Sequence, residues 1–340
     1  MTSRELFKAT ISGEQTPRPP VWLMRQAGRF LPEYRQLKKS YTFTEIVKNP
    51  ELAVEATLQP IRRFDFDCAI IFSDILVVAE ALGFEYQFKE TGGISLLKTI
   101  SSQRDIDEMQ ARVSTVCEHL SYVKTALEIL RKELPNKAIY GFCGAPWTLA
   151  CYMVQGENTA GFPKLLALKN ERPDLFEKMM KIISQASSEY AKMQLSTGID
   201  AFQIFDSHAG LTKQGTYFET SGKWVSKIVD DIKGNATSVV FANEMSNRLQ
   251  EVVKCNADFY SLDASKKLSQ VRKEFDVGLQ GNLPPEVLSN TTIEESKKRT
   301  SEIVDDMRPL RRHIFNLAHG IRPDAKLENV EAMCQAIREK

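Results

Sequence analysis

Two arginines, Arg25 and Arg29, follow directly after a short apolar run at residues 21–24. An arginine keeps its charge, is costly to bury without a partner, and carries a planar guanidinium that matches a carboxylate or a phosphate. The apolar run predicts a short buried strand, so both cations are expected at the edge of a core. This pattern predicts a binding site for an anionic ligand. The alternative is that nearby Asp or Glu side chains neutralise both arginines.

Short apolar runs rich in β-forming residues recur along the chain, separated by segments of helical composition. Strand, helix, strand repeated eight times is the pattern of a closed parallel (β/α)₈ barrel of the α/β class, with a doubly wound open sheet as the alternative. The connection at 74–137 is too long for one helix, and its Gly92-Gly93 pair predicts a turn or a small excursion. The strands are expected at residues 20–24, 68–73, 138–143, 200–206, 237–242, 259–262, 277–280 and 313–318, and helices at 75–82, 122–134, 173–195, 223–232 and 265–275.

Size and composition favour a single domain over residues 1–340, since 42% of the residues are hydrophobic and no linker or internal repeat divides the chain. The formal net charge is +1, from 45 basic and 44 acidic residues. This balance argues against nucleic acid as a partner and against binding to a membrane surface. Any attraction for an anion must therefore come from local clustering of charge.

The cysteines and histidines indicate a reducing compartment and argue against zinc. The six cysteines are widely spaced, with no CxxC pair and no disulfide framework. The four histidines show neither an HExxH motif nor a ligand spacing with those cysteines. The N-terminus lacks the features of a secretory signal, and no apolar run is long enough to span a membrane. We therefore expect a soluble cytoplasmic protein with reduced thiols and no metal.

Polar and charged residues recur where the predicted strands end. In a barrel the carboxyl ends of all strands converge on one mouth, where the loops build the active site. The clustering predicts a cleft at that face, independently of any family likeness. The residues, from the first strand to the last, are Arg25 and Arg29, Ser73 and Asp74, the segment 144–152 ending in Tyr152, Ser207 and His208, Asn243 and Glu244, Asp263, Asn282, and His319.

Several sequence blocks resemble one known family, the uroporphyrinogen decarboxylases. The run PVWLMRQAGRFLPEYR at residues 20–35 is similar to the N-terminal signature of that family. The blocks IIFSDIL, GFCGAPWTLACYMVQG, FDSHAG, GLQGNL and LAHGIRPD follow in the same order as in the family. The resemblance spans almost the whole chain.

The resemblance implies a carboxy-lyase of tetrapyrrole (haem) biosynthesis. Such an enzyme converts uroporphyrinogen III to coproporphyrinogen III by removing carbon dioxide from the four acetate arms, which become methyl groups. Many decarboxylases need a cofactor to accept the departing electron pair, but here a protonated pyrrole ring can accept it. The resemblance therefore implies an enzyme without a metal or organic cofactor, and it also implies a homodimer.

The resemblance assigns roles to residues that match the family's motifs. It implies that Asp74 accepts hydrogen bonds from the pyrrole N–H groups, that Tyr152 lies near it, and that Ser207 donates to a substrate carboxylate. Arg25 is expected near the reacting acetate, where it or a water delivers a proton. The implied catalytic residues are Asp74, Arg25 and Tyr152, and the implied substrate-binding residues are Arg25, Gln26, Ala27, Gly28, Arg29, Asp74, Tyr152, Ser207 and His319.

Each of these assignments has a structural alternative. Asp74 could cap the following helix, Tyr152 could be a core residue, and His319 could bond nearby backbone. Ser207 and His208 could suggest a nucleophile and its base, but adjacent residues at a strand end point to different sides and no third partner is evident, so covalent catalysis is rejected. Five further residues, Gln26, Arg35, Asp67, Phe205 and Asn282, could support the site, line its wall or be structural.

Two other functions compete with a decarboxylase. One is a zinc-dependent methyltransferase of the same broad barrel superfamily, against which the missing ligand spacing argues. The other is a tetrapyrrole carrier without catalytic activity, which would have less reason to possess the whole set of candidate residues.

Overall fold

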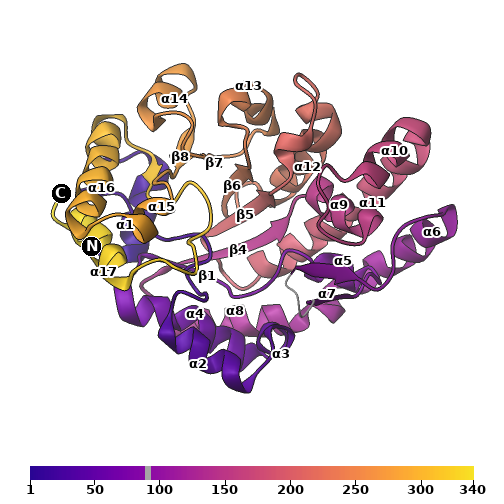
Figure 1. Ribbon diagram of the computed structural model, residues 1–340, viewed down its shortest axis with the longest axis horizontal. Helices are drawn as coiled ribbons and strands as arrows, with labels where there is room; N and C mark the ends of the chain where they lie inside the picture. The colour runs from indigo at the N-terminus through magenta and orange to yellow at the C-terminus, as the bar shows by residue number, and fades with distance from the viewer. Residues whose placement is uncertain (89–92) are drawn as a thin grey trace.

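The computed structural model describes residues 1–88 and 93–340, and its centre is a curled parallel sheet surrounded by helices (Figure 1). Each strand pairs in parallel with the next along the chain, apart from a separate hairpin. The strands, in spatial order, are β1 (Cys68–Ile70), β4 (Ala138–Gly144), β5 (Ala201–Asp206), β6 (Thr237–Ala242), β7 (Phe259–Ser261), β8 (Gly278–Gln280) and β9 (His313–Ile314).

The segment around Val21 closes the sheet into a barrel. Phe315 N–H donates to Pro20 O at 2.9 Å on one side, and Asp67 N–H donates to Val21 O at 2.9 Å on the other. Val21 also forms a parallel bridge with Phe315. The predicted first strand is therefore a short bridging segment, and it occupies the place of the eighth strand between β9 and β1.

Helices cover the outside of the barrel, and several begin with the capping box in which a Ser or Thr and an acidic residue satisfy each other's backbone N–H groups. Thr2 with Glu5 and Thr42 with Glu45 are two examples. The helices are α1 (Ser3–Ser12), α2 (Pro32–Ser40), α3 (Phe43–Lys48), α4 (Pro50–Phe64), α5 (Val77–Ala81), α6 (Gln103–Arg112), α7 (Val116–His119), α8 (Ser121–Glu133), α9 (Pro146–Gln155), α10 (Pro163–Glu171), α11 (Pro173–Leu195), α12 (Lys223–Ile232), α13 (Leu249–Val252), α14 (Leu268–Glu274), α15 (Glu286–Asn290), α16 (Ile293–Met307) and α17 (Leu327–Arg338).

These bounds agree closely with the helices expected from the sequence, and α11 and α12 begin and end at the expected residues. The long connection after β1 contains a small antiparallel hairpin, β2 (Tyr86–Phe88) with β3 (Ile94–Leu96), as well as helices. An excursion in this connection is confirmed, while Gly92 of the predicted turn lies outside the described residues.

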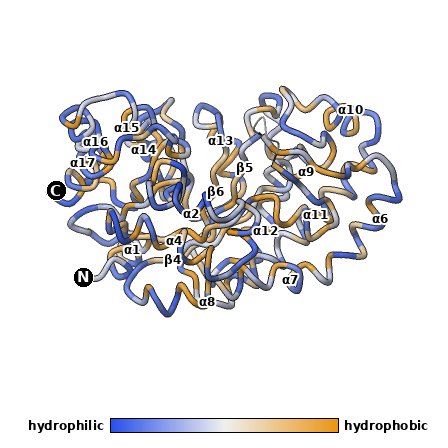
Figure 2. The backbone as a smooth tube through the Cα atoms, turned by 60° about the horizontal axis from the view of Figure 1, so that its bottom comes forward, coloured by the Kyte–Doolittle hydropathy of each residue, from blue (hydrophilic) through white to orange (hydrophobic). Residues whose placement is uncertain are grey.

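The core fills the barrel and the layer between strands and helices, and Figure 2 shows apolar stretches through the middle of the molecule with hydrophilic segments around it. Inside the barrel, three buried polar side chains satisfy one another. Trp22 Nε1–H donates to Gln280 Oε1 at 3.0 Å, and Gln280 Nε2–H donates to Gln203 Oε1 at 2.9 Å. Buried polar groups are costly unless they are hydrogen-bonded. These two hydrogen bonds therefore fix the segment of Trp22, β8 and β5 in one arrangement relative to each other.

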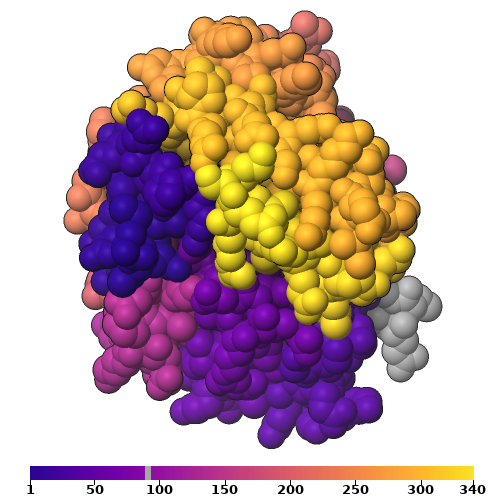
Figure 3. Space-filling model, turned by 90° about the vertical axis from the view of Figure 1, so that its left-hand side faces the viewer, coloured from indigo at the N-terminus to yellow at the C-terminus, as the bar shows by residue number. Residues whose placement is uncertain are grey.

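The N-terminal and C-terminal segments lie side by side on one flank of the barrel (Figure 3). Arg338 Nη2–H donates to Phe64 O at 2.6 Å, which ties the last helix to the end of α4. Across the described residues, we find no helix with the length and apolar character needed to span a bilayer.

Candidate active site

Arg25 and Arg29 are exposed to solvent just after the bridging segment. Within residues 1–88 and 93–340, neither guanidinium forms a salt bridge with a carboxylate, so the alternative in which both arginines are neutralised finds no support. The Arg25 guanidinium lies among enough protein atoms that burial lowers its pKa, and Arg29 lowers it further, while Tyr152 and Asp74 oppose both effects. Three of the other predicted site residues therefore lie close enough to Arg25 for their charges to act on its pKa.

The turn that carries the two arginines is held from beneath by Gln26. This side chain is fully buried, accepts a hydrogen bond from Leu23 N–H at 3.0 Å and donates one to Cys68 O at 3.1 Å. Its side-chain amide is therefore committed to the backbone of two neighbouring segments. Gly28 is required in the same turn because a Cβ atom there would lie 2.8 Å from Arg25 O.

Arg25 adopts a left-handed backbone conformation, with φ of 65°, which is strained for a residue with a side chain. Its side chain passes directly over Gly320, where an added Cβ would lie 2.5 Å from Arg25 Cδ and 2.9 Å from Arg25 Nε. Gly320 follows His319 in the segment after β9, so the Arg25 side chain packs directly against the backbone of that segment. Gly320 was not among the predicted site residues, although it stands beside His319 in the LAHG block.

Asp74 follows β1 and is partly buried. Its Oδ1 atom accepts a hydrogen bond from Leu76 N–H at 2.7 Å, which closes a tight turn before α5. Helix α5 itself begins at Val77 without a side-chain cap. Asp74 therefore does not cap α5 as the structural alternative proposed, and among the described residues its only bond of this kind is the one to Leu76 N–H. Burial raises the pKa of Asp74 to about 6, against the lowering effects of the Leu76 hydrogen bond and the Arg25 charge.

Tyr152 lies on α9 and is half-buried rather than part of the closed core. Burial, followed by the charge of Asp74, raises the pKa of Tyr152 to about 12, so the phenol stays protonated. Its hydroxyl has no hydrogen-bond partner among the described residues. The ring packs against Phe162, with centroids 5.7 Å apart, and against His208 at 5.4 Å.

Ser207 and His208 follow β5, and both are half-buried. The Ser207 carbonyl accepts a hydrogen bond from Asn243 Nδ2–H at 3.4 Å, while its hydroxyl has no partner within the described part of the chain. Burial lowers the pKa of His208 to about 4, so its imidazole is neutral near pH 7. No hydrogen bond joins the two side chains, which agrees with the rejection of a nucleophile-and-base pair.

His319 is half-buried, and its ring meets Phe241 edge-to-face with centroids 5.7 Å apart. Burial lowers the pKa of His319, and the nearby Arg25 charge lowers it further. Neither ring nitrogen bonds the backbone of a described residue, so the structural alternative for this histidine is not supported. Phe241 in turn contacts Phe205 at 6.0 Å, and the two form an aromatic wall beside His319.

The remaining supporting residues are structural, apart from Phe205 in that wall. Asp67 binds Arg18 through two hydrogen bonds of 2.6 and 3.0 Å at the opposite end of the strands. Arg35 donates to the backbone carbonyls of the Arg29 turn, and Asn282 donates to the carbonyls of two residues in the loop after β7.

A buried network that sequence reasoning missed supports the loop after β5. Asp206 is fully buried and accepts hydrogen bonds from Thr148 Oγ1–H at 2.7 Å and Ser221 Oγ–H at 2.6 Å. Thr148 Oγ1 also accepts a bond from His208 N–H at 3.2 Å. Asp206 belongs to the FDSHAG block and directly precedes Ser207. Its place in that block is the feature of the sequence that could have indicated a supporting role.

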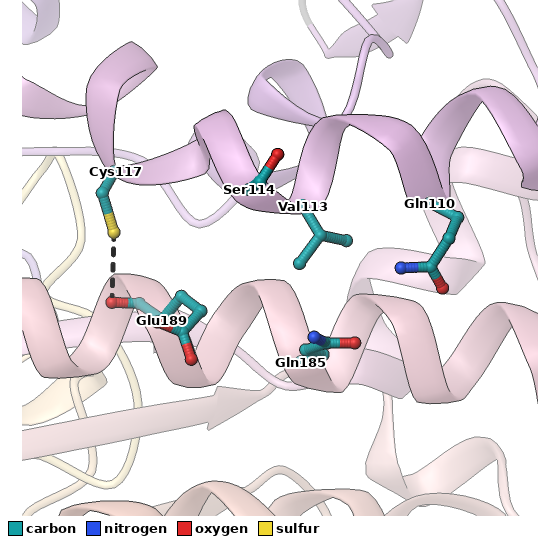
Figure 4. Close-up of a pocket in the computed structure, with 6 residues that line it drawn as sticks. All are labelled: Gln110, Val113, Ser114, Cys117, Gln185 and Glu189. Atoms are coloured by element: carbon teal, nitrogen blue, oxygen red, sulfur yellow. Dashed lines mark hydrogen bonds between the residues drawn. The ribbon is translucent and has the colours of Figure 1, made fainter.

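A separate hollow of about 270 Å³ lies between α11 and the segment from α6 to α7 (Figure 4). Cys117 Sγ–H donates to Glu189 O at 3.5 Å across it. None of the predicted site residues lines this hollow, so it is distinct from the barrel mouth. Its lining residues are Gln110, Val113, Ser114, Cys117, Gln185 and Glu189.

Among the described residues, no group of three or more His, Cys, Asp or Glu side chains is arranged to hold a metal ion. The groups gathered at the mouth are two cations, one carboxyl group with a raised pKa, the imidazole of His319, a phenol and a hydroxyl. This set can bind several carboxylates at its edge and place one anion beside a developing positive charge.

Comparison with known proteins gives a full-length family match. The model of the uroporphyrinogen decarboxylase (URO-D) family matches residues 2–340. Relatives named uroporphyrinogen decarboxylase include those of Chlorobaculum parvum, 36% identical with 100% of this chain and 99% of the relative covered, and of Methylobacillus flagellatus, 36% identical with 99% and 98% covered. That of Coxiella burnetii is 35% identical, with 98% and 94% covered.

Solved structures confirm the fold class. A methyltransferase from Methanosarcina mazei superposes with a TM-score of 0.84 at 20% identity and covers 100% of this chain and 99% of its own. A B12-independent methionine synthase from Shewanella sp. W3-18-1 gives a TM-score of 0.53 at 13% identity, with 96% of each chain covered. At these identities the likeness concerns the fold alone, and with the curled parallel sheet it supports the predicted (β/α)₈ barrel.

Proposed function

Because this chain belongs to the uroporphyrinogen decarboxylase family, we propose that it removes carbon dioxide from the four acetate arms of uroporphyrinogen III, giving coproporphyrinogen III, at the mouth of its barrel. The observation that carries the site assignment is the pair of arginines, Arg25 and Arg29, that have no carboxylate partner among the described residues, with Arg25 near Asp74. A substrate with many carboxylates supplies the anions that these cations lack, and its pyrrole N–H groups supply donors for Asp74.

The reaction replaces a carboxylate by a proton, so each acetate arm consumes one proton and releases one carbon dioxide. Protonation of a ring carbon makes the pyrrole cationic, and the electrons of the breaking carbon–carbon bond then flow into that ring. The exocyclic carbon is protonated next and becomes a methyl group, and the ring proton leaves. The substrate itself accepts the electrons, which removes the need for an organic cofactor or a metal.

Asp74 is suited to stabilise the cationic ring. One of its oxygens is held by Leu76 N–H at 2.7 Å, which fixes the carboxylate before the substrate arrives. A fixed anion stabilises a developing positive charge more strongly in a partly buried site than in water, and it needs no reorganisation during the reaction. Several N–H donors, and later a cationic ring, would return the carboxyl group to its ionised form, against the burial that raises its pKa.

Arg25 and Arg29 are suited to hold the substrate carboxylates, since a guanidinium fork binds a carboxylate through two parallel hydrogen bonds. Arg25 lies near both Asp74 and His319, whose pKa values respond to its charge. This position is suited to the reacting acetate, with Arg25 or a water held by it delivering a proton. Both arginines belong to the rigid turn that Gln26 holds from beneath.

Tyr152, Ser207 and His319 complete the proposed site. The phenol of Tyr152 and the hydroxyl of Ser207 have no hydrogen-bond partner in the described part of the chain, and His319 offers a neutral imidazole. In this proposal the protonated Tyr152 lies beside the ring near Asp74, and Ser207 donates to a carboxylate. Ala27 and Gly28 contribute backbone and space rather than side-chain chemistry, and Gln26 positions the turn.

The wider expectations belong to the same proposal. We propose a single domain over residues 1–340, supported by one continuous hydrophobic core, and a homodimer. We place the enzyme in the cytoplasm, where reducing conditions suit six unpaired cysteines, most of them buried. Neither nucleic acid nor a membrane is expected as a partner.

The test is anaerobic incubation of the purified protein with uroporphyrinogen III, followed by separation of the products by their number of carboxylates. The proposal predicts products with successively fewer carboxylates, down to four, and unchanged turnover after exhaustive dialysis against a chelator. Binding without carbon dioxide release would favour a carrier, and activity restored only by a metal would favour metal-dependent chemistry.

A further inference from the structure

We propose that His208 and Phe162 are positioning residues that hold the Tyr152 ring in place through ring contacts. The proposal rests on the function proposed above, because it concerns how Tyr152 is presented to the substrate. It assigns the imidazole of His208 a packing role and neither an acid–base nor a nucleophilic one.

The three rings form a closed triangle of contacts. His208 lies 5.4 Å from Tyr152 and 4.6 Å from Phe162, and Tyr152 and Phe162 are themselves 5.7 Å apart, all measured between ring centroids. Separations of this size are the range in which aromatic pairs attract each other. The Tyr152 hydroxyl has no partner in the described structure, so packing alone restrains this side chain before the substrate binds, and the two ring contacts contribute to that packing.

His208 is itself fixed to the helix that carries Tyr152. Its carbonyl accepts a hydrogen bond from Trp147 Nε1–H at 3.0 Å, and its N–H donates to Thr148 Oγ1 at 3.2 Å. Thr148 in turn donates to the buried Asp206 at 2.7 Å. Both backbone groups of His208 are therefore bound to α9, so the imidazole and Tyr152 belong to one rigid unit.

Phe162 closes the triangle from a strained position. It has φ of 45° and ψ of 60°, the left-handed region, directly before Pro163. A non-glycine residue is disfavoured there, and the following proline restricts the residue further. The strain persists while the Phe162 ring stays 2% exposed against the other two rings. Strained residues of this kind gather where the surrounding structure fixes a functional group.

The chemistry of the imidazole supports a packing role. His208 Nε2 is buried and has no hydrogen-bond partner among the described residues. A buried polar atom without a partner costs free energy, and a phenyl ring in the same space would not carry that cost. The contribution of His208 to Tyr152 is therefore the shape of the ring and not the nitrogen.

The test compares His208→Ala with His208→Phe in the decarboxylation assay, with wild-type turnover measured first so that failure of the proposed function is recognised separately. We expect His208→Ala to lower kcat by about 10- to 100-fold, because small misplacements of a site group cost this much. His208→Phe should keep kcat within about threefold and should unfold at the same or a higher temperature. An active wild type with His208→Phe as impaired as His208→Ala would overturn the proposal.

A double-mutant cycle separates positioning from general packing. In a Tyr152→Phe enzyme, adding His208→Ala should change kcat much less than it does in the wild type, because both act on the same side chain. Phe176→Ala is the matched control, since Phe176 contacts Trp147 of α9 at 6.2 Å and, within the described residues, makes no aromatic ring contact with Tyr152 or His208. It should lower the unfolding temperature and keep kcat. Independent effects of His208→Ala and Tyr152→Phe would contradict the proposal.

Discussion

The two ends of the barrel use arginine and aspartate in opposite ways. At the amino ends of the strands, Asp67 binds Arg18 through hydrogen bonds of 2.6 and 3.0 Å, and Asp200 binds Arg4 at 2.7 Å and Arg131 at 2.9 Å. At the carboxyl ends, Arg25, Arg29 and Asp74 lie near one another without forming a salt bridge among the described residues.

The difference separates charges that hold the fold from charges kept for a ligand. A paired charge at the amino end is neutralised by the fold itself, and breaking a buried pair costs more than the pair contributes. An unpaired charge at the mouth lowers the stability of the fold slightly, and it remains available to form a favourable interaction with a charged group of the substrate. Substitutions at the mouth should therefore change activity, and equivalent ones at the amino end should change stability.

The largest effect is expected from Arg25→Met, which removes the cation and keeps an unbranched side chain that replaces only the aliphatic part of the arginine. We expect kcat/KM to fall by about 10³-fold, because a charge placed for the reacting carboxylate is lost. The free energy of unfolding should stay the same or rise, since the repulsion from Arg29 also disappears.

The matched control for Arg25→Met is Arg62→Met, whose arginine pairs with Glu55 on the surface. It should leave both quantities unchanged. If Arg25→Met lost stability and kept its activity, Arg25 would serve the fold and not the substrate, which would contradict the difference proposed between the two ends.

Asp67→Asn tests the amino end of the barrel. Its carboxylate is 1% exposed and accepts hydrogen bonds from Arg18, Val21 N–H and Ser3 Oγ–H. Removing the charge leaves Arg18 without its partner, so the free energy of unfolding should fall by about 3–5 kcal/mol. Chemical denaturation measures this loss, and Asp305→Asn, at an exposed pair with Lys340, should change little. An altered kcat in the folded Asp67→Asn enzyme would weaken the contrast.

Gly320→Ala tests whether the position of the Arg25 side chain at the mouth matters for activity. The added methyl would lie 2.5 Å from Arg25 Cδ, so the Arg25 side chain must move. We expect kcat/KM to fall by about tenfold, a moderate displacement cost, with the unfolding temperature nearly unchanged. The decisive control is the double variant with Arg25→Met, in which Gly320→Ala should have no further effect. An equal loss in both backgrounds would show that Gly320 does not act through Arg25.

The smallest effect concerns the pH dependence of stability. The pKa of Asp74 is about 6 in the folded protein, above its ordinary value of 3.8, so the folded state binds this proton more tightly than the unfolded state. Stability is therefore lost as the pH rises through this window, and the loss is complete above pH of about 6. Asp74→Asn should unfold at a higher temperature than the wild type near neutral pH, with the difference vanishing near pH 4. Calorimetry across this range measures the difference, and a constant difference would contradict the raised pKa.

Much of the barrel could be predicted from the sequence because most parallel strands lie in short apolar runs, with polar residues at the end of the run or a few residues beyond it. The run at 237–242 and the helix at 173–195 match β6 and α11. The first strand differed because Val21 is shared between two neighbours over a single bridge, a long-range arrangement that no local pattern records.

The nearness of the charged residues at the mouth could be predicted from the sequence, whereas the role of a polar residue depends on contacts that the sequence does not record. Arg25, Arg29 and Asp74 come together as expected. Asp67 and Gln26 are also polar, but Asp67 binds Arg18 and Gln26 binds the Cys68 carbonyl. These contacts show that both side chains support the fold. The need for Gly320 follows from the path of the Arg25 side chain, which only three-dimensional contacts reveal.

The most direct test of the central claim is the single-turnover rate of Asp74→Asn with uroporphyrinogen III under anaerobic conditions, with folding and substrate binding measured in parallel. The substitution removes the negative charge and nearly preserves the shape of the side chain. We expect Asp74→Asn to fold, to bind the substrate and to release carbon dioxide at least about 10²–10³-fold more slowly than the wild type. A folded Asp74→Asn protein that decarboxylates at a near-normal rate would contradict the claim that this carboxylate stabilises the cationic ring.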